Sequence, residues 1–325
     1  MELRKDPITR SWVVIGHSEP GEVPQESCPL CPGSEGETRT ILQLPAQGPW
    51  QVRVFPHFRP LYRIEGEPER SAEGIYDRMS GVGAHEILVD TPNHDWGVAR
   101  ETPEHMALVL EAYARRLTDL KRDPRFKYVT VFKNEGVNSG QEWAHSHSQI
   151  TATTFVPRRV LYELRAARDW FRERERCVFC DILRQEEKQE KRVVDSQSNY
   201  VAFCPYASRV PFETWIMPRH HNHEFEAPGS EDFRSLGALL ARVLRRLPAI
   251  SEGYHMVVHT SPNSQQTIGE LSDYWRTISD DYHWHIEILP IVPTSGKSYV
   301  IKEVYFNGLR PEQAAERLRQ VSPDS

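Results

Sequence analysis

The sequence predicts an α+β fold built from two similar halves in tandem. The chain has 325 residues, which is enough for two domains. A pair of cysteines separated by two residues occurs twice, and so does a His-x-His sequence. Each half has the same order of parts: CxxC, strands, a histidine in a turn, a helix, a strand and His-x-His. Repetition of this order favours duplication of one α+β unit, with halves at 1–158 and 159–325. The alternative is two unrelated domains that share common pieces.

The composition limits the class of protein. Hydrophobic residues make up 38% of the chain and charged residues 26%, values typical of a folded protein. The net charge of −6 includes no broad basic excess, so we expect no nucleic-acid partner. There is no apolar run of about 18 residues that would span a membrane, and the first residues lack the apolar core of a signal peptide. We therefore expect a cytoplasmic protein without membrane contact.

Local patterns predict the elements of the first half. A turn and a strand are expected within residues 3–15. Runs rich in β-branched and aromatic residues predict strands at 51–55, 86–90 and 127–132. A helix is predicted at 102–120, because Thr102 can cap it, Pro103 suits its first position and apolar residues recur at helical spacing.

The second half repeats this order. A basic amphipathic helix is predicted at 159–175, just before the second CxxC pair. Strands are predicted at 200–204, 213–217 and 254–259, with a helix at 231–246 between the last two. A final helix is expected to begin at Pro311.

The central motif of the first half is His145-Ser146-His147-Ser148-Gln149. Because side chains alternate along a strand, His145, His147 and Gln149 are expected on one face and the two serines on the other. Three nitrogen-bearing polar side chains in a row make a poor core and a good site. The alternative is a hydrated strand face that happens to be rich in histidine.

The two CxxC pairs predict two metal centres. In a cytosolic chain such pairs indicate metal or redox sites before disulfides, and zinc favours a tetrahedral set of two cysteines and two histidines. The first set is Cys28, Cys31, His94 and His145, and the second is Cys177, Cys180, His221 and His283. Four protein ligands make such sites structural. His220 and His223 are alternatives to His221, and the second centre could hold iron. A redox role for the CxxC pairs would leave the paired histidines unexplained.

If His145 binds metal, His147 on the same face stays free. A neutral imidazole is a nucleophile that can attack phosphorus and split one transfer into two steps. Gln149 can donate an N–H to a phosphate oxygen. The loop from Gly136 to Gly140 can offer backbone N–H groups to phosphates.

The His-x-His-x-Gln sequence, following Val131–Gly136, resembles the active-site motif of the galactose-1-phosphate uridylyltransferase family, a branch of the histidine triad superfamily. The form with serines resembles in particular the branch that includes ADP-glucose phosphorylase. The resemblance covers nearly the whole chain, from Leu3–Pro7 at the start to Pro311–Leu318 at the end.

This resemblance implies two histidine-triad-like halves, each an antiparallel sheet with packed helices, in a homodimer. It implies a ping-pong reaction through a nucleotidyl-His147, with Gln149 steadying the α-phosphate and Asn134 near the nucleotide phosphates. Candidate substrate-binding residues also include Gly140, Ser148 and Asn307. Gln149 stands where related hydrolases have a third histidine, and Gln cannot act as a general acid. That fits an intermediate that awaits a phosphorylated acceptor.

Some residues depart from the family pattern. His57 stands where an Asn is common, and Ser298–Ile301 replaces a Phe-Glu-x-Gly pattern. Glu142 would bring negative charge toward a phosphate site unless it points away or pairs with an Arg. The second His-x-His is followed by Glu287 instead of Gln, so we interpret it as scaffold, with His285 structural or lining the opposite wall of the cleft.

The function expected first is transfer of a nucleoside monophosphate from a nucleotide sugar to a phosphorylated acceptor, a hexose 1-phosphate. One alternative is a phosphorylase that uses orthophosphate on a nucleotide sugar or a dinucleoside polyphosphate. Hydrolysis of a dinucleoside polyphosphate, with Glu142 acting on water, is a related alternative. A non-enzymatic alternative is a zinc-stapled nucleotide-binding protein without turnover.

Overall fold

The computed structural model describes residues 1–16, 28–34, 36, 38–227, 229–263, 275–292 and 304–323. The sequence departure at Ser298–Ile301 lies outside these residues. Within the described part, no helix is both long and apolar enough to cross a membrane.

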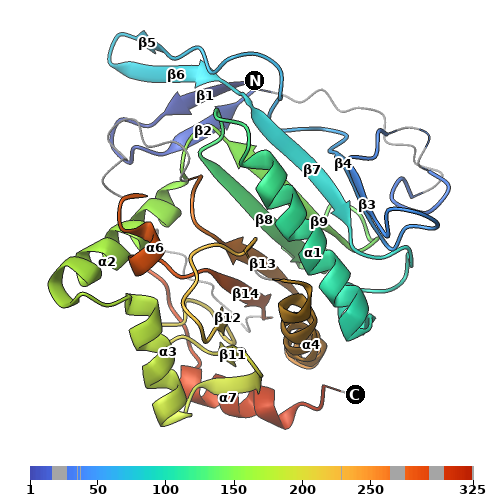
Figure 1. Ribbon diagram of the computed structural model, residues 1–325, viewed down its shortest axis with the longest axis vertical. Coiled ribbons are helices and arrows are strands. Elements are labelled where there is room, and N and C mark those ends of the chain that lie inside the picture. The colour runs from blue at the N-terminus through green and yellow to red at the C-terminus, as the bar shows by residue number, and fades with distance from the viewer. Residues whose placement is uncertain are drawn as a thin grey trace.

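One antiparallel sheet of ten strands runs through the molecule in the order β10-β11-β12-β14-β13-β8-β9-β7-β4-β3 (Figure 1). Its strands from the first half are β3 (Leu42–Leu44), β4 (Val52–Pro56), β7 (Gly83–Val89), β8 (Tyr128–Glu135) and β9 (His147–Thr153). Those from the second half are β10 (Val193–Gln197), β11 (Tyr200–Phe203), β12 (Thr214–Pro218), β13 (Gly253–His259) and β14 (His285–Ile291). Each half therefore contributes five strands.

The two half-sheets are related by their strand order. Outward from the centre, β8-β9-β7-β4-β3 on one side matches β13-β14-β12-β11-β10 on the other. β8 and β13 pair at the centre, with Phe132 opposite Val257. Phe132 also lies opposite Gln149, and Val257 lies opposite Glu287, so Gln149 and Glu287 occupy equivalent positions. The predicted fold class is confirmed. The boundary between residues 158 and 159 stays a prediction.

Two equivalent helices, α1 (Pro103–Leu120) and α4 (Ser230–Arg246), pack against each other on one face of this sheet (Figure 1). The predicted cap of α1 is present, because the side chain of Thr102 accepts a hydrogen bond from the backbone N–H of His105. At the contact, a Cβ on Gly237 would lie 3.0 Å from the carbonyl oxygen of Pro103. Glycine therefore allows the two helices to approach closely.

The opposite face of the second half is covered by α2 (Arg158–Arg174), α3 (Val178–Gln189) and the short α6 (Ile278–Asp281). Apolar residues of α2 and α3 form a core with β11 and β12. The same face of the first half is covered by irregular segments, including the loop with Leu30, the segment with Phe58 and the segment with Trp143. The two half-sheets are therefore covered by different kinds of segment on this face.

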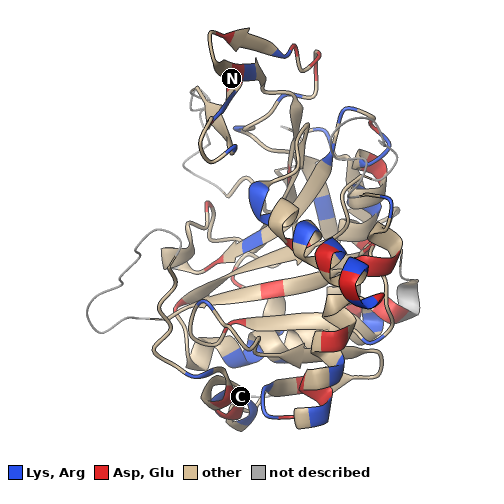
Figure 2. Ribbon diagram, turned by 90° about the vertical axis from the view of Figure 1, so that its left-hand side faces the viewer, with Lys and Arg blue, Asp and Glu red and all other residues tan. Residues whose placement is uncertain are grey.

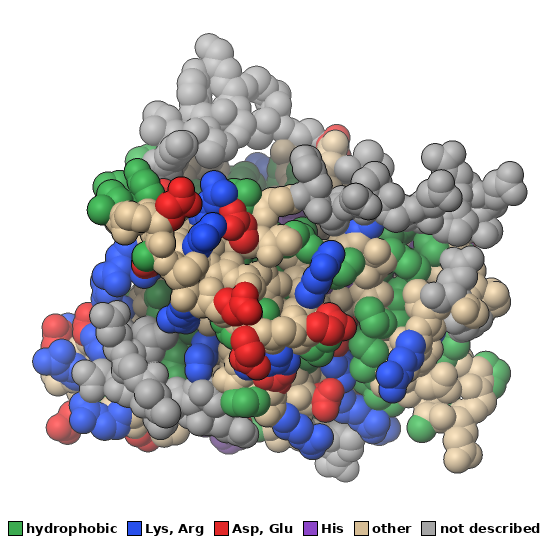
Figure 3. Space-filling model, turned by 90° about the horizontal axis from the view of Figure 1, so that it is seen from above, with side chains coloured by type: hydrophobic (Ala, Val, Ile, Leu, Met, Phe, Trp, Pro, Cys, Tyr) green, Lys and Arg blue, Asp and Glu red, His purple; other side chains and the backbone are tan. Residues whose placement is uncertain are grey.

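Smaller elements complete the fold. A separate sheet has the order β2-β1-β6-β5, formed by β1 (Glu2–Lys5), β2 (Trp12–Ile15), β5 (Ser71–Glu73) and β6 (Tyr76–Ser80). The short helices are η2 (Val98–Arg100), η3 (Val137–Ser139) and η4 (Leu247–Ala249), and the final helix is α7 (Pro311–Gln320). Acidic and basic residues are interspersed along the helices (Figure 2), and their side chains are interspersed on the face seen from above (Figure 3).

Candidate active site and metal centres

The His-x-His-x-Gln sequence enters β9, which lies between β7 and β8. His147 pairs with Val89 and Gln149 with Ile87 across β7. Ser146 and Ser148 point to the other face, where both hydroxyls donate to the Asp90 carboxylate, at 3.1 and 2.8 Å. The expected alternation of side chains is therefore present.

The ring of His147 is held in one tautomer. Its Nδ1 lies 2.8 Å from the carbonyl oxygen of His145, and because a carbonyl can only accept, Nδ1 carries the proton. Nε2 then has the lone pair, and it makes no hydrogen bond within the described residues. Burial lowers the pKa of His147 below its ordinary value, which favours the neutral ring. This nitrogen is suited to nucleophilic attack.

A buried charge network lies behind β9. Lys133 and Asp90 are both fully buried, and their ion pair measures 2.8 Å. The Lys133 ammonium also donates to the Ser146 hydroxyl at 2.8 Å and to the carbonyl of His147 at 3.2 Å. Although burial disfavours its charge, Asp90 and Glu135 raise the pKa of Lys133. The network thus fixes the backbone that carries His147.

Ser148 belongs to this network and not to the His147 face. Besides its bond to Asp90, its hydroxyl lies 2.6 Å from the Tyr113 hydroxyl on α1. Its side chain is directed away from His147, so a substrate contact by Ser148 would have to come from its backbone. Sequence reasoning missed the network. The signal was present, because Lys133 follows Val129 and Val131 at a spacing of two residues and therefore lies on the same, core-facing side of the strand.

On the His147 face, Gln149 is bonded to a histidine that sequence reasoning missed. Nε2 of His85 lies 2.8 Å from Oε1 of Gln149. The His85 ring stacks on His57, with centroids 4.0 Å apart and ring planes 12° apart. Trp143 meets His147 edge-on, with centroids 5.3 Å apart. His85 is in register with β9 two residues before Ile87, so the strand period places it on this face.

The charge of Glu142 is compensated. Its carboxylate lies 3.0 Å from Nε2 of His57 and 2.6 Å from the Arg59 guanidinium. Although partial burial acts in the opposite direction, His57 and Arg59 lower the pKa of Glu142. Pairing with an arginine was one of the two arrangements that the sequence allowed for Glu142.

The first metal candidate brings together Cys28, Cys31, His94 and His145, whose ligand atoms all lie within 4.8 Å of one another. Nδ1 of His94 is 3.3 Å from the sulfur of Cys31, and Nδ1 of His145 is 3.5 Å from it. Nε2 of His145 donates to the carbonyl of Thr91 at 2.7 Å, which leaves the lone pair on Nδ1, facing the sulfurs. The four residues are therefore arranged so that they could hold one metal ion.

The second metal candidate groups Cys177, Cys180, His221 and His283 in the same way. The sulfur of Cys180 lies 3.3 Å from Nδ1 of His221 and 3.4 Å from Nδ1 of His283. Nε2 of His221 donates to the carbonyl of Ser279 at 2.8 Å, so this ring also offers Nδ1. The cluster contains His221 and neither of the two alternatives, His220 and His223. The second CxxC pair sits at the start of α3, an element that the sequence did not predict.

A third cluster was missed: Glu163, His259, His285 and Glu287. His259 bridges the two carboxylates, at 3.0 Å from Glu163 and 3.3 Å from Glu287. Although burial opposes its charge, these carboxylates raise the pKa of His259 to about 10. Nε2 of His285 is buried without a hydrogen-bond partner in the described part of the chain. The signal in the sequence was His285 and Glu287 on one strand face, but Glu163 and His259 come from other elements.

The other predicted substrate residues lie in three places. Asn134 is on the central strand β8, with Oδ1 2.9 Å from Nδ1 of His255. Gly140 adopts φ +74°, and a Cβ added to it would meet nothing within 4 Å. The side-chain amide of Asn307 donates to the carbonyls of Ser208 and Val210, both at 3.0 Å, in the second half.

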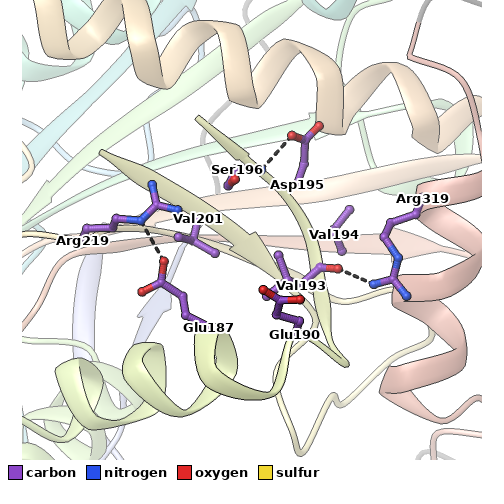
Figure 4. A pocket seen from close by; sticks show the side chains of 9 residues that line it. All are labelled: Glu187, Glu190, Val193, Val194, Asp195, Ser196, Val201, Arg219 and Arg319. Atoms are coloured by element: carbon purple, nitrogen blue, oxygen red, sulfur yellow. Dashed lines mark hydrogen bonds and ion pairs between the residues drawn. The ribbon is translucent and has the colours of Figure 1, made fainter. Parts of the chain in front are cut away.

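A cavity of about 600 Å³ lies between α3, β10 and α7, apart from all these residues (Figure 4). Arg219 binds Glu187 there at 2.7 Å, Arg319 donates to the carbonyl of Val193, and Asp195 is held by two arginines of α4. The described residues that line the cavity include no histidine or cysteine that could serve as a nucleophile. The candidate active site therefore stays at His147.

Comparisons with known proteins identify relatives of the chain. Residues 10–157 match the family described as galactose-1-phosphate uridyl transferase, N-terminal domain. ADP-glucose phosphorylase of Arabidopsis thaliana is 29% identical over 99% of this chain and 93% of its own length. Galactose-1-phosphate uridylyltransferase of Thermotoga maritima is 25% identical over 99% of this chain and 98% of its own.

Solved structures give the same result. The crystal structure of an ADP-glucose phosphorylase from Arabidopsis thaliana with bound ADP-glucose is 28% identical and has a TM-score of 0.78, covering 99% of this chain and 100% of that one. A uridylyltransferase structure is 27% identical with a TM-score of 0.81, covering 99% and 98%. The fold and the site define a protein of the nucleotidyltransferase type. The chain is similar to the galactose-1-phosphate uridylyltransferase family over its residues 10–157.

Proposed function

We propose that the protein moves a nucleoside monophosphate from a nucleoside diphosphate sugar to a phosphorylated acceptor by a ping-pong mechanism through nucleotidyl-His147. The observation that carries the proposal is the ring of His147, whose Nδ1–H is bound to the His145 carbonyl while Nε2 has no partner in the described chain. Gln149 lies on the same strand face, with its amide nitrogen unbonded within the described residues.

In the first step, Nε2 of His147 attacks the α-phosphorus, and an N–P bond forms. The P–O bond to the sugar 1-phosphate breaks, and that group leaves with the electron pair. The hydrogen bond from Nδ1 to the His145 carbonyl stabilises the positive charge that develops on the ring. A phosphate monoester is a good leaving group, so no general acid is required, and a Gln at position 149 suffices.

In the second step, a phosphate oxygen of the acceptor attacks the same phosphorus. The N–P bond breaks, and its electron pair returns to Nε2. The acceptor proposed first is a hexose 1-phosphate. Orthophosphate is the second candidate, giving a nucleoside diphosphate, because the chain is 29% identical to an ADP-glucose phosphorylase. The two candidates share every step at His147.

We also propose that the Cys28 and Cys177 clusters hold zinc, and that the second could hold iron. The support is the donor set of two thiols and two imidazoles, each imidazole offering Nδ1. A metal at the first site would clip the loop with Cys28 to the start of β9. A homodimer in the cytoplasm is proposed on the family resemblance, and light scattering of the purified protein tests the dimer.

The test uses intact mass spectrometry. The native protein is incubated with UDP-glucose or ADP-glucose and is expected to gain the mass of one nucleoside monophosphate, in an acid-labile form. Addition of galactose 1-phosphate or orthophosphate then shows which acceptor removes the adduct. The proposal fails if no adduct forms with any nucleotide sugar, or if His147→Ala still forms it.

A further inference from the structure

The hydrogen bonds around His85 leave one arrangement of protons. The backbone N–H of Leu61 donates to Nδ1 of His85 at 3.1 Å. A backbone N–H can only donate, so Nδ1 must carry the lone pair and Nε2 must carry the proton. His85 therefore donates from Nε2 and cannot accept there.

This proton fixes the orientation of Gln149. Nε2–H of His85 points at the Gln149 amide from 2.8 Å, and an N–H donor requires an acceptor. The carboxamide must then present Oε1 to His85 and turn its NH2 group away. In the described chain the NH2 group has no protein partner, and it lies on the strand face of His147. Both of its N–H bonds are available to a phosphoryl oxygen.

The ring of His85 is itself held in place. The ring stacks on that of His57, with a centroid distance of 4.0 Å. His57 has the same proton arrangement, because the backbone N–H of Arg59 donates to its Nδ1 at 3.0 Å and its Nε2 faces Glu142. Two backbone N–H donors thus fix the tautomers of two stacked imidazoles, and one of these, His85, fixes the orientation of the Gln149 amide.

We propose that His85 is a positioning residue for nucleotidyl transfer, which keeps the amide NH2 of Gln149 aimed at the phosphoryl group that His147 receives. The inference rests on the proposed function. His85 does not touch the reacting atoms, and it acts through Gln149. A Gln without this partner would be free to flip and present its oxygen to the phosphate, which would repel it.

A matched pair of variants separates the two bonds of His85. In His85→Gln the amide nitrogen lies near the former Nε2 and keeps a donor for Gln149. In His85→Asn the amide lies near the former Nδ1 and keeps an acceptor for the Leu61 N–H, while the donor to Gln149 is lost. The single-turnover rate of adduct formation with UDP-glucose or ADP-glucose is measured for both, together with Gln149→Ala and the double variant His85→Asn/Gln149→Ala.

We expect His85→Asn to slow adduct formation by about 10–100-fold, as is typical when a supporting hydrogen bond is removed from a site. His85→Gln should restore most of the rate, and the double variant should be no slower than Gln149→Ala alone. Rates that multiply in the double variant would overturn the inference, as would a His85→Gln variant that is folded and as slow as His85→Asn.

Nitrogen NMR of the native protein tests the inference without turnover. It should show His85 as the Nε2–H tautomer, with a fixed Gln149 side-chain amide. An Nδ1–H or doubly protonated His85 at neutral pH would overturn the positioning role. Failure of the native protein to form an adduct would overturn the proposed function, so the two failures are distinguishable.

Discussion

The two halves carry equivalent strands with opposite chemistry. In the first half, His147 and Gln149 lie on β9, and the Nε2 of His147 is unbonded within the described chain. In the second, His285 and Glu287 stand at the corresponding positions of β14. Both first histidines of the two motifs, His145 and His283, sit in metal clusters. The halves thus share the candidate metal-binding position and differ in the side chains that come after it on the strand.

One change of side chain accounts for much of this difference. Glu287 carries a charge and attracts partners: it lies 2.8 Å from Arg209 and 3.0 Å from Arg159. His259 and Glu163 extend the same network. A neutral Gln at position 149 cannot gather cations in this way, and its face stays available. The corresponding face of the second half is therefore occupied by ion pairs.

The largest difference between the halves is expected at their second histidines. His147→Ala should lower the rate of adduct formation by about 10⁴-fold or more, as loss of a nucleophile does, with the melting temperature nearly unchanged. His285→Ala should mainly lower the melting temperature, because it leaves a void beside His259 and Trp215, on which it stacks at 4.7 Å in each case. Adduct formation per folded molecule, measured with thermal unfolding, checks this contrast. Equal loss of rate in both variants would contradict it.

The network behind β9 supplies the next largest effect. Lys133→Met leaves Asp90 as an uncompensated buried charge, which is expected to reduce the free energy of unfolding by about 3–5 kcal/mol. The double variant Lys133→Met/Asp90→Asn removes both charges and should recover part of that loss. Urea unfolding of the three proteins measures it. A double variant less stable than Lys133→Met would show that the ion pair is not the main contribution.

The two candidate metal clusters should differ in how strongly their loss affects the rate of adduct formation. Cys31→Ser is expected to lower adduct formation by about 10–100-fold, because His145 then loses its anchor and its carbonyl holds His147. Cys180→Ser should lower thermal stability with a smaller change of rate, since the second cluster lies beside the scaffold half. Metal content by elemental analysis is the control, and each variant should lose about one ion per chain. Equal effects on rate would mean that both clusters support the site alike.

The sequence predicted much of this site for reasons that can be stated. The strand period placed His147 and Gln149 together, and the repeat paired each CxxC with a turn histidine. Prediction from the sequence failed where contacts join elements that are far apart in the chain. His85 is 64 residues from Gln149, and His259 is 96 residues from Glu163. Such pairs have no motif, because burial and register alone bring them together. α3 was missed because the CxxC pair at its start was interpreted only as a metal-binding motif.

The smallest expected effect concerns His85 and pH. Burial lowers the pKa of His85 to about 4, and the neighbouring His57 acts in the same direction. An unfolded chain has the ordinary histidine pKa of about 6.5, so below that value the unfolded state binds more protons than the folded state. Stability from the neutral ring is therefore full above about pH 6.5 and is lost as the pH falls toward 4.

Glu142 and Arg59 also face this stack, and their ion pair persists in that range because the pKa of Glu142 is lowered. Between pH 7 and pH 4.5 the contribution of His85 should be about 2 kcal/mol. His85→Gln lacks the titrating ring and keeps the rest of the site, so it should lose about that much less free energy of unfolding than the native protein over the same interval. Urea unfolding at the two pH values measures the difference. Parallel losses in the two proteins would mean that His85 accepts a proton as readily in the folded state as in the unfolded state.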